Sequence, residues 1–263
     1  MSIGGSIEEF ASMMNKKAEE LGLENSNFIT PHGLDNEEHY TTAYELAQIA
    51  DYALNIKKFA EVVNTKTYTV SINGSSKIIN NTNELLGYLN GVNGVKTGFT
   101  NNAGRCLVTS VNRNEFNIIT VVLGADTKKF RTKDSISLIE YTYSNYELVN
   151  LEKLINEEYE EWSIINKKRI NVYKAKDNNI KTNLEDYSYK IYPIKKEELN
   201  DINIEIKNVK MDFEAPVEIG EKVADVILKI NEKEIINTKI VIDDNIERKG
   251  IGEFFKECLI NFK

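Results

Sequence analysis

The sequence predicts an α+β fold, in which helices cover an antiparallel sheet and a small all-β domain follows. Two observations carry this prediction. Up to about residue 146, helical segments with capping motifs alternate with strands joined by short turns. Beyond that point, short strand-like segments recur at regular intervals. We therefore expect one domain over residues 1–146, a β-rich domain over 150–242 and an amphipathic helix over 243–263.

Two capping boxes fix the starts of the first two helices. Ser6 is followed three residues later by Glu9, and Thr42 is followed three residues later by Glu45. Apolar residues then recur at helical spacing after each box. The helices expected in the first domain cover residues 7–21, 43–55 and 127–143.

The strands alternate with turns rich in glycine and asparagine. In the first domain we expect strands at 67–72, 77–79, around 95–99, 105–111 and 116–123. In the second we expect them at 162–165, 170–173, 187–192, 202–206, 223–229 and 235–242. Because the turns between consecutive strands are short, the first sheet should be antiparallel, with Lys96 on a strand that has at most one neighbour.

Composition excludes several classes of protein. The net charge of −8 argues against a nucleic-acid binder. Cys106 and Cys258 are too few for a disulfide framework, and we interpret both as unpaired thiols. His32 and His39 are the only histidines, and neither has recognisable metal-binding partners, so no metal or cofactor is predicted. No apolar run is long enough to span a bilayer, and residues 1–30 carry no pattern of an export signal.

The segment Gly94–Thr100 combines groups that suit the binding of an anionic peptide end. Lys96 offers an ammonium group and Thr97 a hydroxyl, which together can hold a carboxylate. Gly98 removes the side chain where a peptide adding to the strand edge would pass. A bare Lys-Thr-Gly triplet is common by chance, so a surface lysine beside a turn glycine is the alternative.

The surrounding sequence favours the functional interpretation. The run Gly91–Val108 closely resembles the Lys-Thr-Gly region of the D-alanyl-D-alanine carboxypeptidases, the low-molecular-mass penicillin-binding proteins of the S11 serine peptidase type. Three further blocks, Met14–Leu23, Phe28–Leu34 and His39–Ala47, follow that family's order and approximate spacing. The resemblance implies a partial penicillin-binding-protein or β-lactamase-like domain, followed by the small all-β domain of that family.

The resemblance also implies roles for individual residues. Lys96, Thr97 and Gly98 would bind the terminal carboxylate of the substrate, and Phe99 would supply a backbone N–H to the oxyanion hole. Arg131 falls where the family often has a basic residue facing the carboxylate site, although a surface arginine is the simpler interpretation. No cofactor or metal is implied.

The nucleophile of such an enzyme is missing from the sequence. The family uses a serine and a lysine three residues apart, and no serine in the 263 residues has lysine at that spacing. Ser71-Ile72-Asn73 and Ser110-Val111-Asn112 match the second motif, Ser-x-Asn, only by letter, because neither stands at its place in the family's order. The resemblance therefore implies that the chain starts after both motifs and that no catalytic residue of its own is present.

Two functions stay open at this point. The first is a serine D-Ala-D-Ala carboxypeptidase of peptidoglycan metabolism, here without its nucleophile and incomplete as a catalyst. The second is a catalytically inactive module that binds wall peptides or a partner protein. The implied partners are stem peptides ending in D-Ala-D-Ala and, for the complete enzyme, β-lactams. The family works outside the cytoplasmic membrane, and helix 243–263 would either contact the membrane or pack on the β domain.

Overall fold

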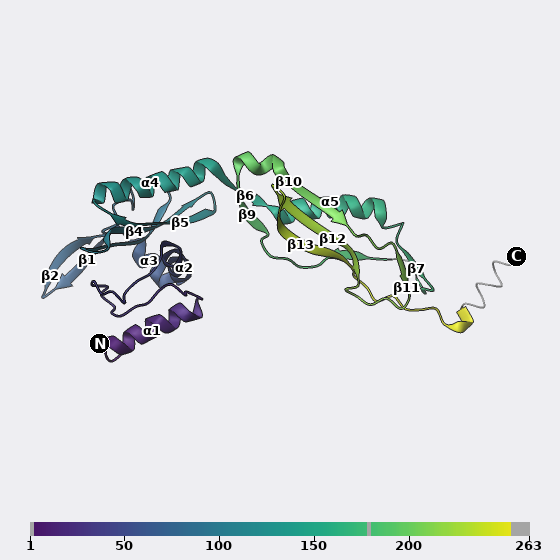
Figure 1. Ribbon diagram of the computed structural model, residues 1–263, viewed down its shortest axis with the longest axis horizontal. Coiled ribbons are helices and arrows are strands. Elements are labelled where there is room, and N and C mark those ends of the chain that lie inside the picture. Colours follow the sequence, from purple (N-terminus) through teal and green to yellow (C-terminus); the bar gives the residue numbers. More distant parts are fainter. Residues whose placement is uncertain (1–2, 178–179, 254–263) are drawn as a thin grey trace. The chain divides into compact units, whose positions relative to one another are not determined.

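The computed structural model describes residues 3–177 and 180–253 of the chain, which divides into two compact units, Met1–Ser144 and Asn145–Lys263 (Figure 1). The architecture is α+β, as the sequence predicts. No helix within the described ranges is long and apolar enough to cross a membrane.

The first unit is built around a three-stranded antiparallel sheet. Its strands are β3 (Val92–Thr100), β4 (Gly104–Arg113) and β5 (Phe116–Ala125), in the order β3-β4-β5. Among the described strands, β3 pairs only with β4, so the expectation that Lys96 lies on an edge strand is confirmed. An edge strand leaves alternate N–H and C=O groups unpaired, which makes it a place where another extended chain can bind.

Helix α4 (Lys128–Asn145) covers one face of this sheet (Figure 1). Ile139 of the helix packs with Leu107 and Val111 of β4 and with Leu85, and all four side chains are fully buried. The hydroxyl of Tyr143 also donates to the backbone carbonyls of β4 and β5 at their connected ends. Leu85 therefore places the segment that precedes β3 on the α4 side of the sheet.

Helices α2 (Ala43–Leu54) and α3 (Lys57–Val63) form the layer on the other face (Figure 1). Ala50 and Val63 pack there with Val95 of β3, and Val108 of β4 lies against the same cluster. The burial of these aliphatic side chains from two separate helices fixes the edge strand against the rest of the unit.

The predicted capping boxes are present at the starts of two helices. The backbone N–H of Glu9 donates to Ser6 Oγ at 3.1 Å at the start of α1 (Ile7–Glu20), and that of Glu45 donates to Thr42 Oγ1 at 3.1 Å. Each hydroxyl satisfies one of the helix N–H groups that have no partner within the helix. The hairpin of β1 (Thr67–Ile72) and β2 (Ser75–Asn80), with its Asn-Gly turn, is also as predicted.

The second unit has a four-stranded sheet and two smaller ones. Its core is a single cluster of aliphatic side chains to which helix α5 (Leu151–Asn166) contributes Leu151 and Ile155. The four-stranded sheet has the order β10 (Ile202–Lys207), β12 (Lys222–Ile230), β13 (Lys233–Ile242) and β8 (Thr182–Leu184). The other pairs are β6 (Tyr146–Asn150) with β9 (Ile191–Lys195), which leads into a 3-10 helix η1 (Lys196–Asp201), and β7 (Asn171–Tyr173) with β11 (Asp212–Glu214).

One strand predicted in this unit is a helix, and another begins later than predicted. The expected strand at 162–165 is the last part of α5, whose buried Leu151 and Ile155 are one helical turn apart and whose first turn is capped by Asn150. The expected strand at 187–192 begins only at Ile191. Helices α3 and α5 and the short strands β6, β8 and β11 were not predicted.

The C-terminal helix expected over 243–263 is contradicted in its first part. Residues 243–250 are not helical, and Ile246 is buried in the core, where it forms a β-bridge with Val217. Residues 251–253 are helical. Residues 254–263, with most of the predicted apolar face and Cys258, lie outside the described residues, whereas Cys106 is a free thiol as expected.

Candidate functional site

Lys96 and Thr97 point to opposite faces of the sheet. Lys96 lies opposite Val108, which packs against the α2 and α3 layer, while Thr97 lies opposite Leu107, which is buried on the α4 side. The Lys96 side chain is exposed, and its ammonium group donates to the Thr97 carbonyl at 2.5 Å. The Lys96 ammonium therefore lies along the open edge of β3, beside backbone groups that a peptide can reach.

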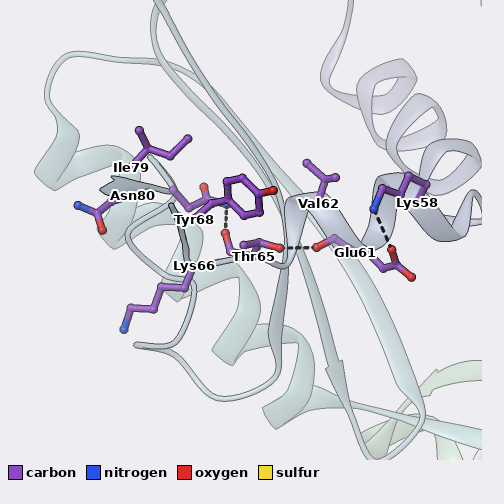
Figure 2. Close-up of a pocket in the computed structure, with 9 residues that line it drawn as sticks. Lys58, Glu61, Val62, Thr65, Lys66, Tyr68, Ile79 and Asn80 are labelled. Carbon is purple, nitrogen blue, oxygen red and sulfur yellow. Dashed lines mark hydrogen bonds and ion pairs between the residues drawn. The ribbon is translucent and has the colours of Figure 1, made fainter. Parts of the chain in front are cut away.

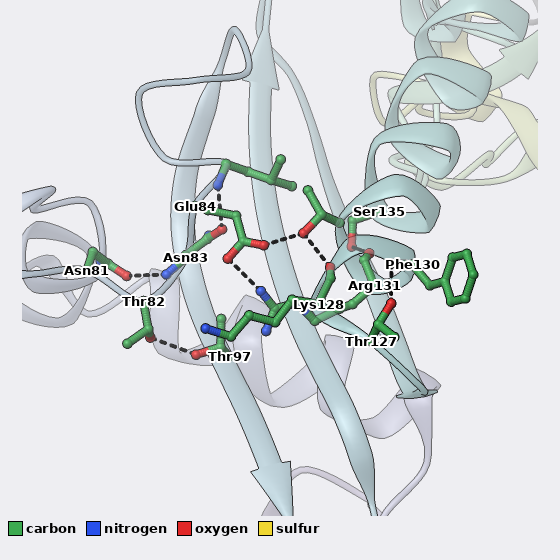
Figure 3. Close-up of polar contacts among 12 residues, drawn as sticks. Asn81, Thr82, Asn83, Glu84, Thr97, Thr127, Lys128, Phe130, Arg131 and Ser135 are labelled. Atoms are coloured by element: carbon green, nitrogen blue, oxygen red, sulfur yellow. Dashed lines mark hydrogen bonds and ion pairs between the residues drawn. The ribbon is translucent and has the colours of Figure 1, made fainter.

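The Thr97 side chain is half-buried and has a hydroxyl partner of its own. Its Oγ1 lies 2.6 Å from Oγ1 of Thr82, and either oxygen can donate in this hydrogen bond (Figure 3). Thr82 is exposed and belongs to the segment Asn81–Glu84, which connects the β1–β2 hairpin to the buried pair Leu85 and Leu86.

Hydrogen bonds on both sides of Thr82 hold this segment in place. The buried Asn83 donates from Nδ2 to the Gly94 carbonyl at 2.8 Å, and its Oδ1 accepts from the backbone N–H of Leu85. Asn81 Oδ1 accepts from the Asn83 N–H at 2.9 Å, and Asn81 Nδ2 donates to carbonyls at the end of α3. The position of the Thr82 hydroxyl is thus set by the fold around it.

Glu84 ties the same segment to α4. Its carboxylate accepts a hydrogen bond from the Thr132 hydroxyl and pairs with Arg131, whose Nη2 lies 2.7 Å from Glu84 Oε2 (Figure 3). Burial on its own would raise the pKa of Glu84, but the hydrogen bonds from Thr132 and Arg131 outweigh it, so the pKa lies below its ordinary value. The arrangement stabilises the ionised form of this carboxylate.

Arg131 is not the surface residue that the simpler interpretation expected. Only 3 % of its side chain is exposed, and its Nε is buried with no hydrogen-bond partner among the described residues. A buried guanidinium needs a counter-ion, and Glu84 supplies one. Through Glu84, Arg131 is tied to the segment that contains Thr82.

The two glycines of β3 differ in the space that the fold leaves for a side chain. A Cβ added at Gly94 would lie 3.1 Å from Val63 Cγ2 of α3, which is tighter than ordinary packing. A Cβ added at Gly98 would meet only Cys106 Cβ, at 3.7 Å, which is an ordinary contact. The fold therefore explains Gly94 but gives no steric reason for Gly98.

Phe99 lies at the exposed end of the motif. The residue is 52 % exposed, and its ring stacks against Arg105 of β4, whose Cζ is 3.6 Å from the ring centroid. Phe99 and Arg105 are directly opposite in the β3–β4 register, so this contact holds the ring on the sheet.

The two histidines have structural roles. His39 Nδ1 accepts from the Ile29 N–H at 3.2 Å, and His32 Nδ1 accepts from the Leu34 N–H at 3.2 Å. Within the described part of the chain, no cluster of acidic, histidine and cysteine side chains is placed to hold a metal ion.

Two hollows of the first unit lie away from Lys96. One, of about 540 Å³, lies between α3 and the β1–β2 hairpin and is lined by Lys58, Val62, Lys66, Tyr68 and Ile79 among others (Figure 2). The other, of about 570 Å³, is lined by α2 residues and by Ser110, Asn117 and Ile119. Neither hollow was predicted from the sequence, nor were the contacts of Thr82 and Glu84, whose signal is the run of five polar residues from Asn80 to Glu84 directly before two buried leucines.

Comparison with known proteins agrees with this fold. A family model for D-alanyl-D-alanine carboxypeptidases of the Peptidase S11 type matches residues 1–127, and one for the C-terminal domain of penicillin-binding protein 5 matches residues 159–248. Residues 1–127 therefore belong to this family of carboxypeptidases, and residues 159–248 to the second domain of the penicillin-binding protein 5 type.

Individual relatives cover nearly the whole chain. It is 32 % identical to the D-alanyl-D-alanine carboxypeptidase DacF of Bacillus subtilis over 98 % of its length, and 27 % identical to DacA of Haemophilus influenzae over 95 %. These matches span 64 % and 60 % of the relatives, so the chain covers less than two thirds of their length.

Solved structures show the same fold. Penicillin-binding protein 5 from Haemophilus influenzae aligns with a TM-score of 0.66 at 25 % identity, over 94 % of this chain and 68 % of that one. The carboxypeptidase DacD from Francisella tularensis aligns with a TM-score of 0.67 at 22 % identity, over 94 % of this chain and 70 % of that one.

Proposed function

We propose that the open edge of β3 binds peptidoglycan stem peptides that end in D-Ala-D-Ala. The peptide would add to the sheet as an extended strand. Although the two side chains leave opposite faces of the sheet, the Lys96 ammonium reaches the Thr97 carbonyl on the strand edge, where the terminal carboxylate would meet this ammonium and the Thr97 hydroxyl. Arg131 belongs to this proposed site as the cation that holds Glu84 and, with it, the segment of Thr82.

The observation that carries the proposal is the contrast between Gly94 and Gly98. A Cβ at Gly94 would crowd Val63, whereas Gly98 is exposed and has ordinary space for a side chain. A glycine that the fold does not need, beside a cation at an open strand edge, fits a position where another backbone approaches closely. Gly98 would let the peptide lie against the strand.

The reaction we propose for the complete site is that of a serine carboxypeptidase. A serine would attack the carbonyl between the two D-alanines, the terminal D-alanine would leave as a free amino acid, and water would release the acyl group. The Phe99 N–H would help to stabilise the oxyanion. Because no serine here has lysine three residues on, we propose that residues 1–263 alone do not carry out this reaction.

A peptide-binding module without catalysis is the second candidate, and the same absence of the serine–lysine pair favours it. Both candidates require the same carboxylate contact. Neither candidate predicts release of D-alanine by residues 1–263 alone. A longer chain that also contains a Ser-x-x-Lys motif separates them, because only the first candidate predicts that such a chain releases D-alanine from a diacyl-L-Lys-D-Ala-D-Ala peptide.

The family and its substrate support a location outside the cytoplasmic membrane, which we propose for this protein. The predicted membrane contact of residues 243–263 stays a prediction, limited to the part beyond residue 250, because Ile246 is buried in the β core. Residues 254–263 lie outside the described part of the chain.

Calorimetric titration with diacetyl-L-Lys-D-Ala-D-Ala, and with the same peptide as its C-terminal amide, tests the binding proposal. We expect the acid to bind more tightly than the amide, and Lys96→Ala to weaken binding of the acid about ten- to a hundred-fold. Lys77→Ala is the matched control, since Lys77 is an exposed strand lysine of the same unit outside the proposed site. Equal affinity for the acid and the amide would contradict a carboxylate site.

A further inference from the structure

We propose that Thr82 is a further positioning residue of the carboxylate site, which acts by donating its hydroxyl proton to Thr97. The two Oγ1 atoms lie 2.6 Å apart, a short distance for a hydroxyl pair. This inference rests on the proposed binding of a carboxylate at Thr97 and adds a residue from outside the Lys-Thr-Gly strand.

The chemistry of two hydroxyls decides the direction of this hydrogen bond when the ligand is present. Each hydroxyl has one proton to donate, and an ionised carboxylate can only accept. If Thr97 gave its proton to Thr82, it would offer the carboxylate only lone pairs, which repel it. A bound carboxylate therefore selects the arrangement in which Thr82 donates to Thr97 and Thr97 donates to the ligand.

This arrangement strengthens both hydrogen bonds. A hydroxyl that accepts a hydrogen bond becomes a better donor, and the effect is larger when the final acceptor is charged. Thr82 also restricts the rotation of the Thr97 side chain, so less freedom is lost on binding. The result is a Thr97 hydroxyl whose proton is already directed at the carboxylate.

The residues on both sides of Thr82 fix the position of its hydroxyl. Asn83 on one side is buried and bonds to the Gly94 carbonyl of β3, and Asn81 on the other side bonds to the end of α3. Glu84 anchors the next residue to Arg131 of α4. Thr82, by contrast, is exposed and directs its one polar group at Thr97 (Figure 3).

Because Thr82 is exposed, its hydroxyl can be removed by substitution without disturbing buried packing. Thr82→Val keeps the β-branched shape at an exposed position and removes only the hydroxyl. Thr82→Ser keeps the hydroxyl and serves as the matched control. Thr97→Val removes the group through which Thr82 is proposed to act.

The test is a double-mutant cycle on peptide binding, measured by calorimetry with diacetyl-L-Lys-D-Ala-D-Ala. We expect Thr82→Val to weaken binding about two- to ten-fold and Thr82→Ser to leave it close to the parent value. In the Thr97→Val background, Thr82→Val should change affinity less than about two-fold, because the partner of its proton is gone. The C-terminal amide, which can also donate, should show a smaller effect of Thr82→Val than the acid.

The outcomes separate this inference from the proposal on which it rests. If the parent chain binds the acid but Thr82→Val has no effect, or has the same effect with and without the Thr97 hydroxyl, the role of Thr82 is overturned while the carboxylate site stands. If the parent binds neither peptide, the carboxylate site is itself refuted and the role of Thr82 falls with it. The melting temperature of each variant shows whether a loss of binding comes from loss of the fold.

Discussion

Arg131 Nη2 lies 2.7 Å from Glu84 Oε2, and this ion pair joins helix α4 to the segment that enters the edge strand. The two partners differ in exposure: Arg131 is 3 % exposed and Glu84 is 42 % exposed. Removing the Glu84 carboxylate would leave the buried Arg131 guanidinium without a counter-ion, which lowers the free energy of unfolding. Removing one partner of an ion pair in which both side chains are exposed lowers it much less.

Glu84→Gln should therefore lower the free energy of unfolding by about 1–3 kcal/mol, a range reduced from that of fully buried pairs because water reaches Glu84. Denaturant unfolding of the parent and the variant measures the difference. Glu20→Gln is the control, because Glu20 belongs to the exposed ion pair with Lys17 and should contribute much less to stability. Equal effects of the two substitutions would show that the burial of Arg131 does not matter.

The same pair predicts a dependence of stability on pH. The pKa of Glu84 lies below its ordinary value in the folded chain, so its ionised form stabilises the fold above about pH 4.3, the value of an unperturbed glutamate. This contribution is lost as the pH falls through the lowered pKa. The stability difference between the parent and Glu84→Gln should shrink as the pH falls from about 5 to 3, and a constant difference over that range would contradict the assignment.

The two glycines of β3 should respond differently to the same substitution. Gly94→Ala should lower the melting temperature, because its Cβ would press on Val63. Gly98→Ala should leave the melting temperature nearly unchanged but weaken peptide binding, since its methyl group would stand where the peptide backbone approaches. Thermal unfolding and peptide titration on both variants give the comparison, and a Gly98→Ala variant with parent affinity would remove the main argument for the edge as a binding site.

Lys96→Arg should restore only part of the affinity lost in Lys96→Ala. Both side chains are cationic, but a planar guanidinium does not reproduce the compact ammonium that donates to the Thr97 carbonyl. Titration of the three chains with the acid peptide should rank them in the order lysine, arginine, alanine. Full recovery by arginine would indicate that only the charge matters, and not the geometry of the contact.

Incubation with benzylpenicillin should produce no covalent adduct of the 263-residue chain. The acylation needs a serine activated by a nearby base, and no serine in the sequence has the family's lysine partner. Intact-protein mass spectrometry is the measurement, with a penicillin-binding carboxypeptidase of the same family as the positive control. A mass increase of one antibiotic molecule would show that another residue of this chain serves as the nucleophile.

The sequence predicted those helices and strands whose signals come from residues a few positions apart. The capping pairs at Ser6 and Thr42 and the edge position of Lys96 follow from short-range spacing and short turns. Helix α3 was missed because its N-cap, Ile56, makes no side-chain hydrogen bond and leaves no capping signal. The end of α5 was predicted as a strand because Trp162–Ile165 is rich in residues that favour strands, while the longer apolar period makes it helical.

The contacts of the site itself depend on tertiary structure. Thr82 and Thr97 are 15 residues apart, and Glu84 and Arg131 are 47 apart, so neither pair has a sequence period that would reveal it. Their meeting requires the register of β3 with β4 and the packing of α4 on the sheet. The motif Lys96–Gly98 was visible in the sequence, whereas the residues that hold it became visible only in the fold.

The ammonium group of Lys96 along the open edge also bears on solubility. An uncovered strand edge can pair with the same edge of another molecule and start aggregation, and a charged lysine there opposes such pairing because two copies would repel. Lys96 thus opposes edge-to-edge pairing of two copies, while the edge stays open for the anionic peptide end that we propose as its ligand. A chain with alanine at this position would lose that protection, and its tendency to self-associate should rise with concentration even where its fold and its core are unchanged.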